Sequence, residues 1–146
     1  MADKTLAVLI ADRVQARINC RESGNQEWLG KHGDVILALV RRYMPHGSGI
    51  DNGATSDIGA STATRLVFHT SYHHMDQNGF YDGWTEHVVR VTPTFGGIDV
   101  TVGGRNRNDI KDYLADMFRD ALERAIPQAD YEKLCIEVNG EPAKAV

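Results

Sequence analysis

Several features that would assign a function directly are missing from this sequence. Its 146 residues include only two cysteines, Cys20 and Cys135, which are far apart and form no CxxC pair. Two isolated thiols suit a reducing cytoplasm and look like small core residues. No apolar stretch reaches the roughly 20 residues of a membrane span, and no leader with a basic start and a small-residue cleavage site is visible. We therefore expect a cytoplasmic protein without a membrane partner.

An excess of positive charge is also missing. The chain has 16 Lys and Arg against 20 Asp and Glu, which gives a net charge of −4. Non-specific binding to nucleic acid depends on neutralising phosphates, so the composition argues against nucleic acid as a partner. No GxSxG, Walker or calcium-loop pattern occurs. We therefore expect no cofactor, no metal site and, in balance, no catalysis.

What the sequence does contain is a long predicted β-hairpin from Thr64 to Phe95. Asn78-Gly79 is a strong signal for a two-residue turn, because both turn positions need a positive φ. A turn there pairs Phe68 with Val89, Tyr72 with Thr85, His74 with Gly83 and Gln77 with Phe80. The alternation then predicts two faces. The face expected against the helices carries Leu66, Phe68, Thr70, Tyr72, His74, Tyr81, His87, Val89 and Val91. The outer face carries Arg65, Val67, His69, Ser71, His73, Met75, Phe80, Trp84, Glu86, Val88 and Arg90.

The remaining elements follow from apolar spacing. Apolar residues three and four positions apart predict helices over 4–21, 26–43 and 109–126, and alternation predicts a strand over 97–103. The length fits one domain. We therefore expect a single α+β domain of order α-α-β-β-β-α, with a three-stranded antiparallel sheet, helices on one face of it, and a flexible tail over 139–146.

Four of the six histidines lie on the predicted hairpin. Alternation separates His69 and His73 from His74 and His87. His69 and His73 are also about 13 Å apart along the strand, too far to share one zinc. His74 and His87 remain a candidate pair for a metal-assisted or acid–base hydrolase, with Asp51, Asp57 or Asp82 from loops. The alternative that we favour is a pair of buried imidazoles with hydrogen bonds to the backbone.

The hairpin tip carries large side chains where a solvated loop would carry polar ones. Exposed aromatic residues beside histidines and acids are typical of a binding surface, although the same side chains could instead cover a small satellite core. A glycine-rich segment over 45–57 adds backbone amides that suit an anion. The predicted binding residues are Ser48, Asp51, His73, His74, Tyr81, Asp82, Trp84, Glu86 and His87, with Arg105 if the turn after the third strand lies close by.

A nucleic-acid-binding module is a further alternative. The order α-β-β-β-α matches that of a double-stranded-RNA-binding domain, which needs basic residues at the start of its last helix. Arg105, Arg107 and Lys111 stand there, but four aspartates crowd them. Topology alone does not fix function.

Three segments, PHGSGIDNG, FHTSYHHMDQNGFYDGWTEHVVRVTP and GRNRNDIKDYL, resemble a group of small proteins of unknown activity encoded by bacteriophages and prophages. The resemblance covers roughly residues 28–122. It implies a small accessory protein of the bacterial cytoplasm, and it brings no catalytic residues with it. We therefore expect a non-catalytic protein that binds a host protein or a small anionic ligand. Exposed aromatic residues on the open sheet face also permit a homodimer.

Overall fold

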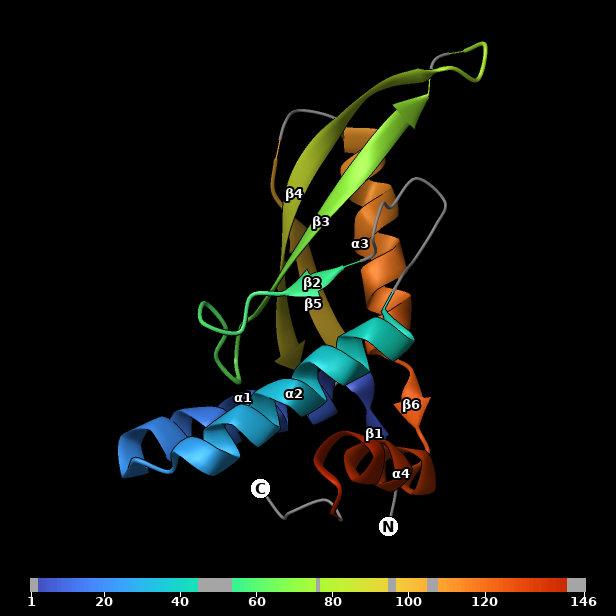
Figure 1. Ribbon diagram of the computed structural model, residues 1–146. Coiled ribbons are helices and arrows are strands. Elements are labelled where there is room, and N and C mark those ends of the chain that lie inside the picture. Colours follow the sequence, from blue (N-terminus) through green and yellow to red (C-terminus); the bar gives the residue numbers. More distant parts are fainter. Residues whose placement is uncertain (1–2, 45–53, 76, 95–96, 105–107, 142–146) are drawn as a thin grey trace.

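Four helices and two antiparallel sheets make up the described part of the chain (Figure 1). The computed structural model describes residues 3–44, 54–75, 77–94, 97–104 and 108–141. The helices are α1 (Leu6–Ser23), α2 (Gln26–Tyr43), α3 (Asn108–Leu122) and α4 (Gln128–Asn139). The main sheet has the order β2 (Thr55–Ser56), β3 (Leu66–Met75), β4 (Tyr81–Thr94) and β5 (Gly97–Val102). A second sheet pairs β1 (Lys4–Thr5) with β6 (Ala125–Ile126).

The α+β class and the antiparallel sheet are confirmed, but β1, β2, β6 and α4 were not predicted. The main sheet has four strands, because β2 pairs with the edge of β3. The last predicted helix ends at Leu122 and is followed by β6 rather than continuing to Ile126. The segment after it forms α4, where the sequence analysis expected no helix. Each missed element depends on a partner that is distant in the sequence.

Local signals set the boundary between the first two helices. Gly24 has the left-handed φ of 77°, and its amide bonds to the Cys20 carbonyl, so α1 ends there. The Asn25 side chain then accepts a hydrogen bond from the Trp28 amide and caps α2. The predicted bounds of α2 are confirmed. Helix α1 begins at Leu6 rather than at Lys4, because Thr5 caps it and Lys4 belongs to β1.

The predicted hairpin register is confirmed over most of its length. Leu66 lies opposite Val91, and the same register continues to His73 opposite Trp84. Between His73 and Met75 the register shifts by one residue, so that Met75 lies opposite Tyr81. Strand β4 takes up the extra residue at Gly83, which has a φ of 86°. Beyond this bulge the predicted pairing is wrong by one residue: the predicted pairs of His74 with Gly83 and of Gln77 with Phe80 are not among the pairs of the described strands.

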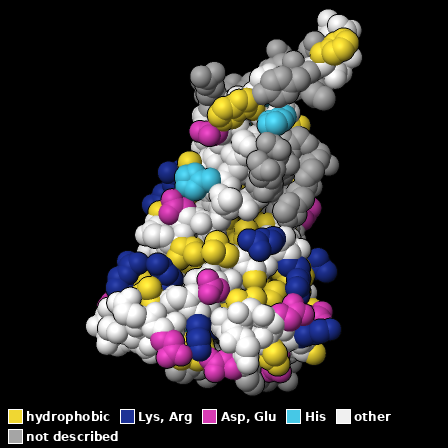
Figure 2. Space-filling model, viewed as in Figure 1, with side chains coloured by type: hydrophobic (Ala, Val, Ile, Leu, Met, Phe, Trp, Pro, Cys, Tyr) yellow, Lys and Arg dark blue, Asp and Glu magenta, His cyan; other side chains and the backbone are white. Residues whose placement is uncertain are grey.

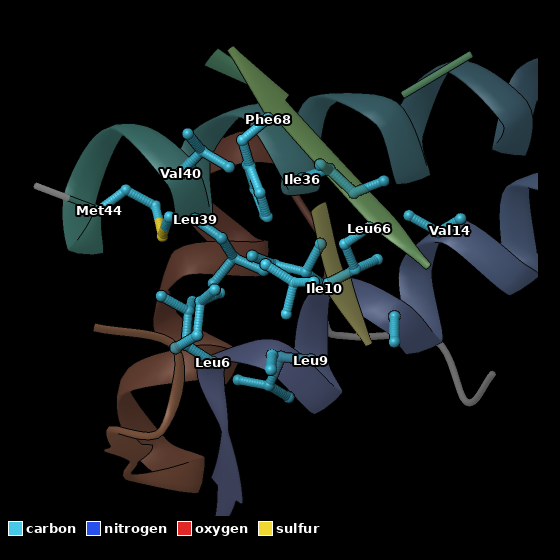
Figure 3. Packing of buried hydrophobic residues seen from close by; sticks show 14 of the residues in the cluster. Leu6, Leu9, Ile10, Val14, Ile36, Leu39, Val40, Met44, Leu66 and Phe68 are labelled. Carbon is cyan, nitrogen blue, oxygen red and sulfur yellow. The ribbon is translucent and has the colours of Figure 1, made fainter. Parts of the chain in front are cut away.

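The inner face of the hairpin base belongs to the main hydrophobic core (Figure 3). Phe68 and Leu66 from β3 are buried together with Ile10 of α1 and Leu39 of α2. The Phe68 ring also lies 5.8 Å from the ring of Phe118 in α3. Burying each such side chain contributes about 1.5–3 kcal/mol. The core therefore ties the base of the hairpin to α1, α2 and α3.

Helix α3 also supports the hairpin above its base. It runs beside the long strands in Figure 1, while α1 and α2 cross below them. Ile110 and Leu114 of α3 form a second buried cluster, against which Tyr72 of β3 and Val102 of β5 pack. Tyr72 also meets Tyr113 edge-on, with ring centroids 5.8 Å apart. The inner side of the hairpin is thus backed by protein well beyond its base.

A buried arginine joins the helices at the other end of the molecule. Arg13 of α1 is 1% exposed. Its Nε donates to the Tyr131 hydroxyl at 2.6 Å, its Nη1 lies 2.8 Å from His32 Nδ1, and its Nη2 donates to the Cys135 sulfur at 3.4 Å. Burying an unpaired charge is costly, so these neutral acceptors from α2 and α4 hold the guanidinium in place. Arg13 therefore binds α4 to the rest of the fold.

Candidate functional site

The hairpin separates the predicted binding residues instead of gathering them on one surface. Trp84 and Glu86 are exposed on the outer face, and His73 lies opposite Trp84. His74 and His87 are buried on the inner face, at 6% and 1% exposure. Ser48, Asp51 and Arg105 lie outside the described residues, and so do the side chains of Tyr81 and Asp82.

The two inner histidines belong to a chain of hydrogen bonds. His74 Nε2 lies 2.9 Å from Thr85 Oγ1, which lies 2.7 Å from His87 Nε2, and His87 Nδ1 lies 2.9 Å from the Gly103 carbonyl. A carbonyl only accepts, so neutral His87 carries its proton on Nδ1 and accepts at Nε2 from the Thr85 hydroxyl. The hydroxyl in turn accepts from His74 Nε2–H. The chain therefore runs in one direction and ends on the turn after β5.

This series of hydrogen bonds limits what the inner histidines can do. Both ring nitrogens of His87 already have partners, one of them a backbone carbonyl. Asp57, which the sequence analysis considered as a loop ligand for this pair, bonds to His69 instead. Across the described residues, no three His, Cys, Asp or Glu side chains are grouped so that they could hold a metal ion. In the described arrangement, His74 and His87 are buried and hydrogen-bonded, as the alternative of buried imidazoles predicts.

The outer face holds a different constellation, which we call the arginine pocket. It is a surface hollow of about 310 Å³ over the lower part of β3 and β4. Its volume lies in the range of small-ligand sites. Figure 2 shows histidine side chains reaching the surface along the hairpin, with lysines and arginines below them. The residues lining the arginine pocket are Asp57, Ala60, Arg65, Val67, His69, Val88 and Arg90.

Asp57 and His69 form a hydrogen bond at the side of the arginine pocket. Asp57 Oδ2 lies 2.9 Å from His69 Nε2, and Asp57 Oδ1 accepts from the Ala60 amide at 3.2 Å. The His69 hydrogen bond, followed by the Ala60 amide, holds the pKa of Asp57 below its usual value. The Asp57 carbonyl also accepts from the Ser61 hydroxyl, which fixes the turn that carries the carboxylate. Both carboxylate oxygens of Asp57 therefore already have hydrogen-bond partners.

Unlike Asp57, the two guanidinium groups of the arginine pocket, those of Arg65 and Arg90, have no ion-pair partner among the described residues. Asp57 is the only acid among the described lining residues, and its oxygens already have donors. Two arginines and an imidazole therefore face a hollow with one engaged carboxylate. Arginine forks suit carboxylate and phosphate oxygens, so the pocket is suited to an anion.

A second hollow, which we call the tryptophan pocket, lies further up the hairpin. It has a volume of about 490 Å³ and is lined by Trp84, Thr85, Glu86 and Gly104. Trp84 is 53% exposed, and Phe80 near the turn is 70% exposed. These two aromatic side chains therefore do not cover a satellite core, which was one of the two predicted alternatives. The turn after β5 does reach the predicted surface, through Gly104.

Part of the arginine pocket follows from the sequence, although the sequence does not identify it as a site. Arg65, His69 and Arg90 were already predicted to share the outer face, and the structure confirms this register. What the sequence did not show is that β2 pairs with β3 and brings Asp57 over His69. A two-residue strand leaves no readable periodicity.

Comparison of the chain with protein-family models, with curated proteins and with solved structures gives no match. Among the described helices, none combines the length and the apolar character that crossing a bilayer demands.

Proposed function

We propose that this chain is a small cytoplasmic binding protein, of phage or prophage accessory type, that captures an anionic ligand in the arginine pocket without transforming it. The observation that supports this proposal is that Arg65 and Arg90 line one hollow of about 310 Å³, in which the carboxylate of Asp57 is already hydrogen-bonded to His69. The resemblance of three sequence segments to phage-encoded proteins supports the accessory role and the bacterial cytoplasm.

The lining of the arginine pocket favours binding over chemistry. Its described side chains include no hydroxyl, thiol or amine that would serve as a nucleophile beside His69. Asp57 fixes the His69 ring through Nε2, so the imidazole stands in a set orientation beside the two guanidinium groups. Such an arrangement attracts and orients an anion. We therefore expect retention of the ligand and no turnover.

Inorganic phosphate is the probe for this proposal, measured by isothermal titration calorimetry at constant ionic strength. Replacing Arg65 or Arg90 by Gln removes one charged fork, so each variant is expected to bind phosphate at least about tenfold more weakly. Arg21→Gln is the matched control, because Arg21 is exposed at the end of α1. Equal phosphate affinity in the wild type and in both pocket variants would contradict the proposal.

A second candidate function is capture of a host protein by the hairpin tip. The exposure of Trp84 and Phe80, at 53% and 70%, supports it, since aromatic anchors dominate protein interfaces. Trp84→Ala is expected to leave the far-UV circular dichroism unchanged and to reduce recovery of host proteins in a pull-down. Leu37→Ala, an exposed apolar position on α2, is the control. Unchanged recovery of host proteins with Trp84→Ala would contradict capture by the hairpin tip. A homodimer formed through the same face would be detected by sedimentation velocity.

A further inference from the structure

The tryptophan pocket differs from the arginine pocket in the sign of the charge that it offers. We propose that it is a second, independent site, which binds the cationic head group of an alkylammonium ligand between Trp84 and Glu86. The chemistry is that of a quaternary ammonium ion or of a lysine side chain. This proposal does not depend on the anion site, and the two can be tested separately.

The aromatic ring of Trp84 stands open to a ligand. Trp84 is a large apolar side chain that is 53% exposed and belongs to neither hydrophobic cluster of the described residues. It lines a hollow of about 490 Å³ instead of filling a core. The face of an indole ring attracts a cation that lies within about 6 Å of it, more strongly than other aromatic rings do. The ring is therefore available to a positively charged ligand.

A negative charge lies beside the Trp84 ring. Glu86 stands two residues after Trp84 on β4, so both side chains leave the same face of the strand, about 7 Å apart along it. Glu86 lies opposite Ser71, a neutral residue, and it takes part in no ion pair in the described chain. A cation held over the ring therefore lies within reach of an uncompensated carboxylate.

The turn at Gly104 forms one wall of the tryptophan pocket, and its position is set by contacts within the protein. Gly104 has a φ of 122°, and a Cβ atom on it would fall 2.7 Å from His87 Nδ1 and 2.8 Å from the Glu86 carbonyl. The backbone there is packed against β4 too closely for any side chain. His87 also donates to the Gly103 carbonyl at 2.9 Å, which ties the turn to β4. A fixed wall lowers the ordering cost of binding.

Fluorescence of Trp84 provides the direct test. Trp28→Phe leaves Trp84 as the only tryptophan of the chain. This variant is titrated with tetramethylammonium chloride and with Nα-acetyl-lysine methylamide. Sodium chloride and Nα-acetyl-norleucine methylamide serve as controls for ionic strength and for apolar contact. A saturable change with a dissociation constant of the order of 1 mM is expected for at least one of the two cations.

The role of Glu86 is tested by Glu86→Gln in the same background. Removing the carboxylate charge is expected to weaken the responding cation about fivefold or more, while Asp99→Asn, an exposed acid on β5, is expected to leave its affinity unchanged. Both variants lie at exposed positions, and circular dichroism checks that they fold.

Each outcome decides something. Saturation by tetramethylammonium supports a site for free ammonium ions, and saturation by the lysine derivative alone supports recognition of a partner's lysine. No saturable change with either cation, an equal response to the norleucine derivative, or full affinity in Glu86→Gln would overturn the proposal. Phosphate binding at the arginine pocket is unaffected by any of these results, so failure here is distinct from failure of the proposed function.

Discussion

At the scale of single residues, the fold depends on a few side chains whose partners are fixed by burial. Arg13 is the clearest example, because its guanidinium is enclosed and its acceptors are a phenol, an imidazole nitrogen and a sulfur. Burial raises the pKa of the Cys135 thiol, although Arg13 acts in the opposite direction, so the sulfur stays a neutral acceptor. Removing one acceptor leaves a buried donor without that bond, which is expensive.

Tyr131→Phe is expected to lower the free energy of unfolding by about 1.5–3 kcal/mol at neutral pH, because it removes a hydrogen bond to a charged group. Burial raises the pKa of Tyr131 from 10.0 to about 12. Below pH 10 the wild type therefore keeps the full stability that the neutral phenol gives it. As the pH rises towards 12, its free energy of unfolding falls by about 2–3 kcal/mol. Urea titrations at several pH values should show the gap between the two proteins narrowing over that range. A gap that stays constant would contradict the burial of the phenol.

Gly104→Ala tests the close approach of the turn after β5. The added methyl group meets His87 Nδ1 at 2.7 Å and the Glu86 carbonyl at 2.8 Å, at a φ of 122°. Steric overlap and an unfavourable backbone conformation together predict a loss of about 2 kcal/mol or more in unfolding free energy. Gly30→Ala is the control, since nothing lies within 4 Å of its built Cβ, and it should stabilise α2 by about 0.5–1 kcal/mol. A neutral result at Gly104 would mean that the turn is not held against β4.

At the scale of elements, the hairpin is the part of the molecule that the sequence predicts best. The Asn78-Gly79 turn and the alternation of side chains fixed the register from Leu66 to His73. The bulge at Gly83 was not predicted, because an extra residue preserves the local alternation on either side of it. Helix α4 was missed although Tyr131, Leu134, Cys135 and Val138 have helical spacing, since the segment is short and its mean apolar content is low.

The candidate site shows the same division. The outer-face positions followed from alternation, and the exposure of Trp84 and Glu86 agrees with the predicted surface. The Asp57–His69 contact could not be predicted, because it depends on how a glycine-rich segment returns to the sheet edge. Tertiary pairing of this kind leaves no periodic signal in the chain.

Thr85→Val tests the hydrogen-bond chain that stiffens the hairpin. The substitution keeps the shape of the side chain and removes the hydroxyl that joins His74 Nε2 to His87 Nε2. We expect the free energy of unfolding to fall by about 1–3 kcal/mol, because both nitrogens lose that partner in a buried place. Thr92→Val, on an exposed position of the same strand, should change it by less than about 0.5 kcal/mol. Equal effects at the two positions would show that the hydrogen bonds through Thr85 do not stabilise the fold.

At the scale of the whole molecule, one hydrophobic core connects the helices to the base of the hairpin, while the tip extends beyond it. Residues of α1, α2, α3, β3 and β4 belong to the same buried cluster. Trp84, next to the bulge, and Phe80, beyond it, have largely exposed side chains. Regions with few buried contacts open at lower cost than the core, so the molecule should have a firm base and a more easily opened tip.

Native-state hydrogen exchange measured by mass spectrometry would test this gradient. Peptides from 66–70, 87–91 and α2 are expected to exchange with one common, highest free energy of opening, because they share the core. Peptides from 77–83 are expected to exchange at a clearly lower free energy. Comparable protection at the tip and the base would show that the tip is held by contacts other than those described.

The contacts of Arg13 also constrain when the molecule can be completed during its synthesis. Its acceptors Tyr131 and Cys135 lie 118 and 122 positions later in the chain, and Lys4 pairs with Ile126 in the same region. During translation the guanidinium therefore leaves the ribosome well before either acceptor has been made. The helical end must therefore close after position 135 has been made.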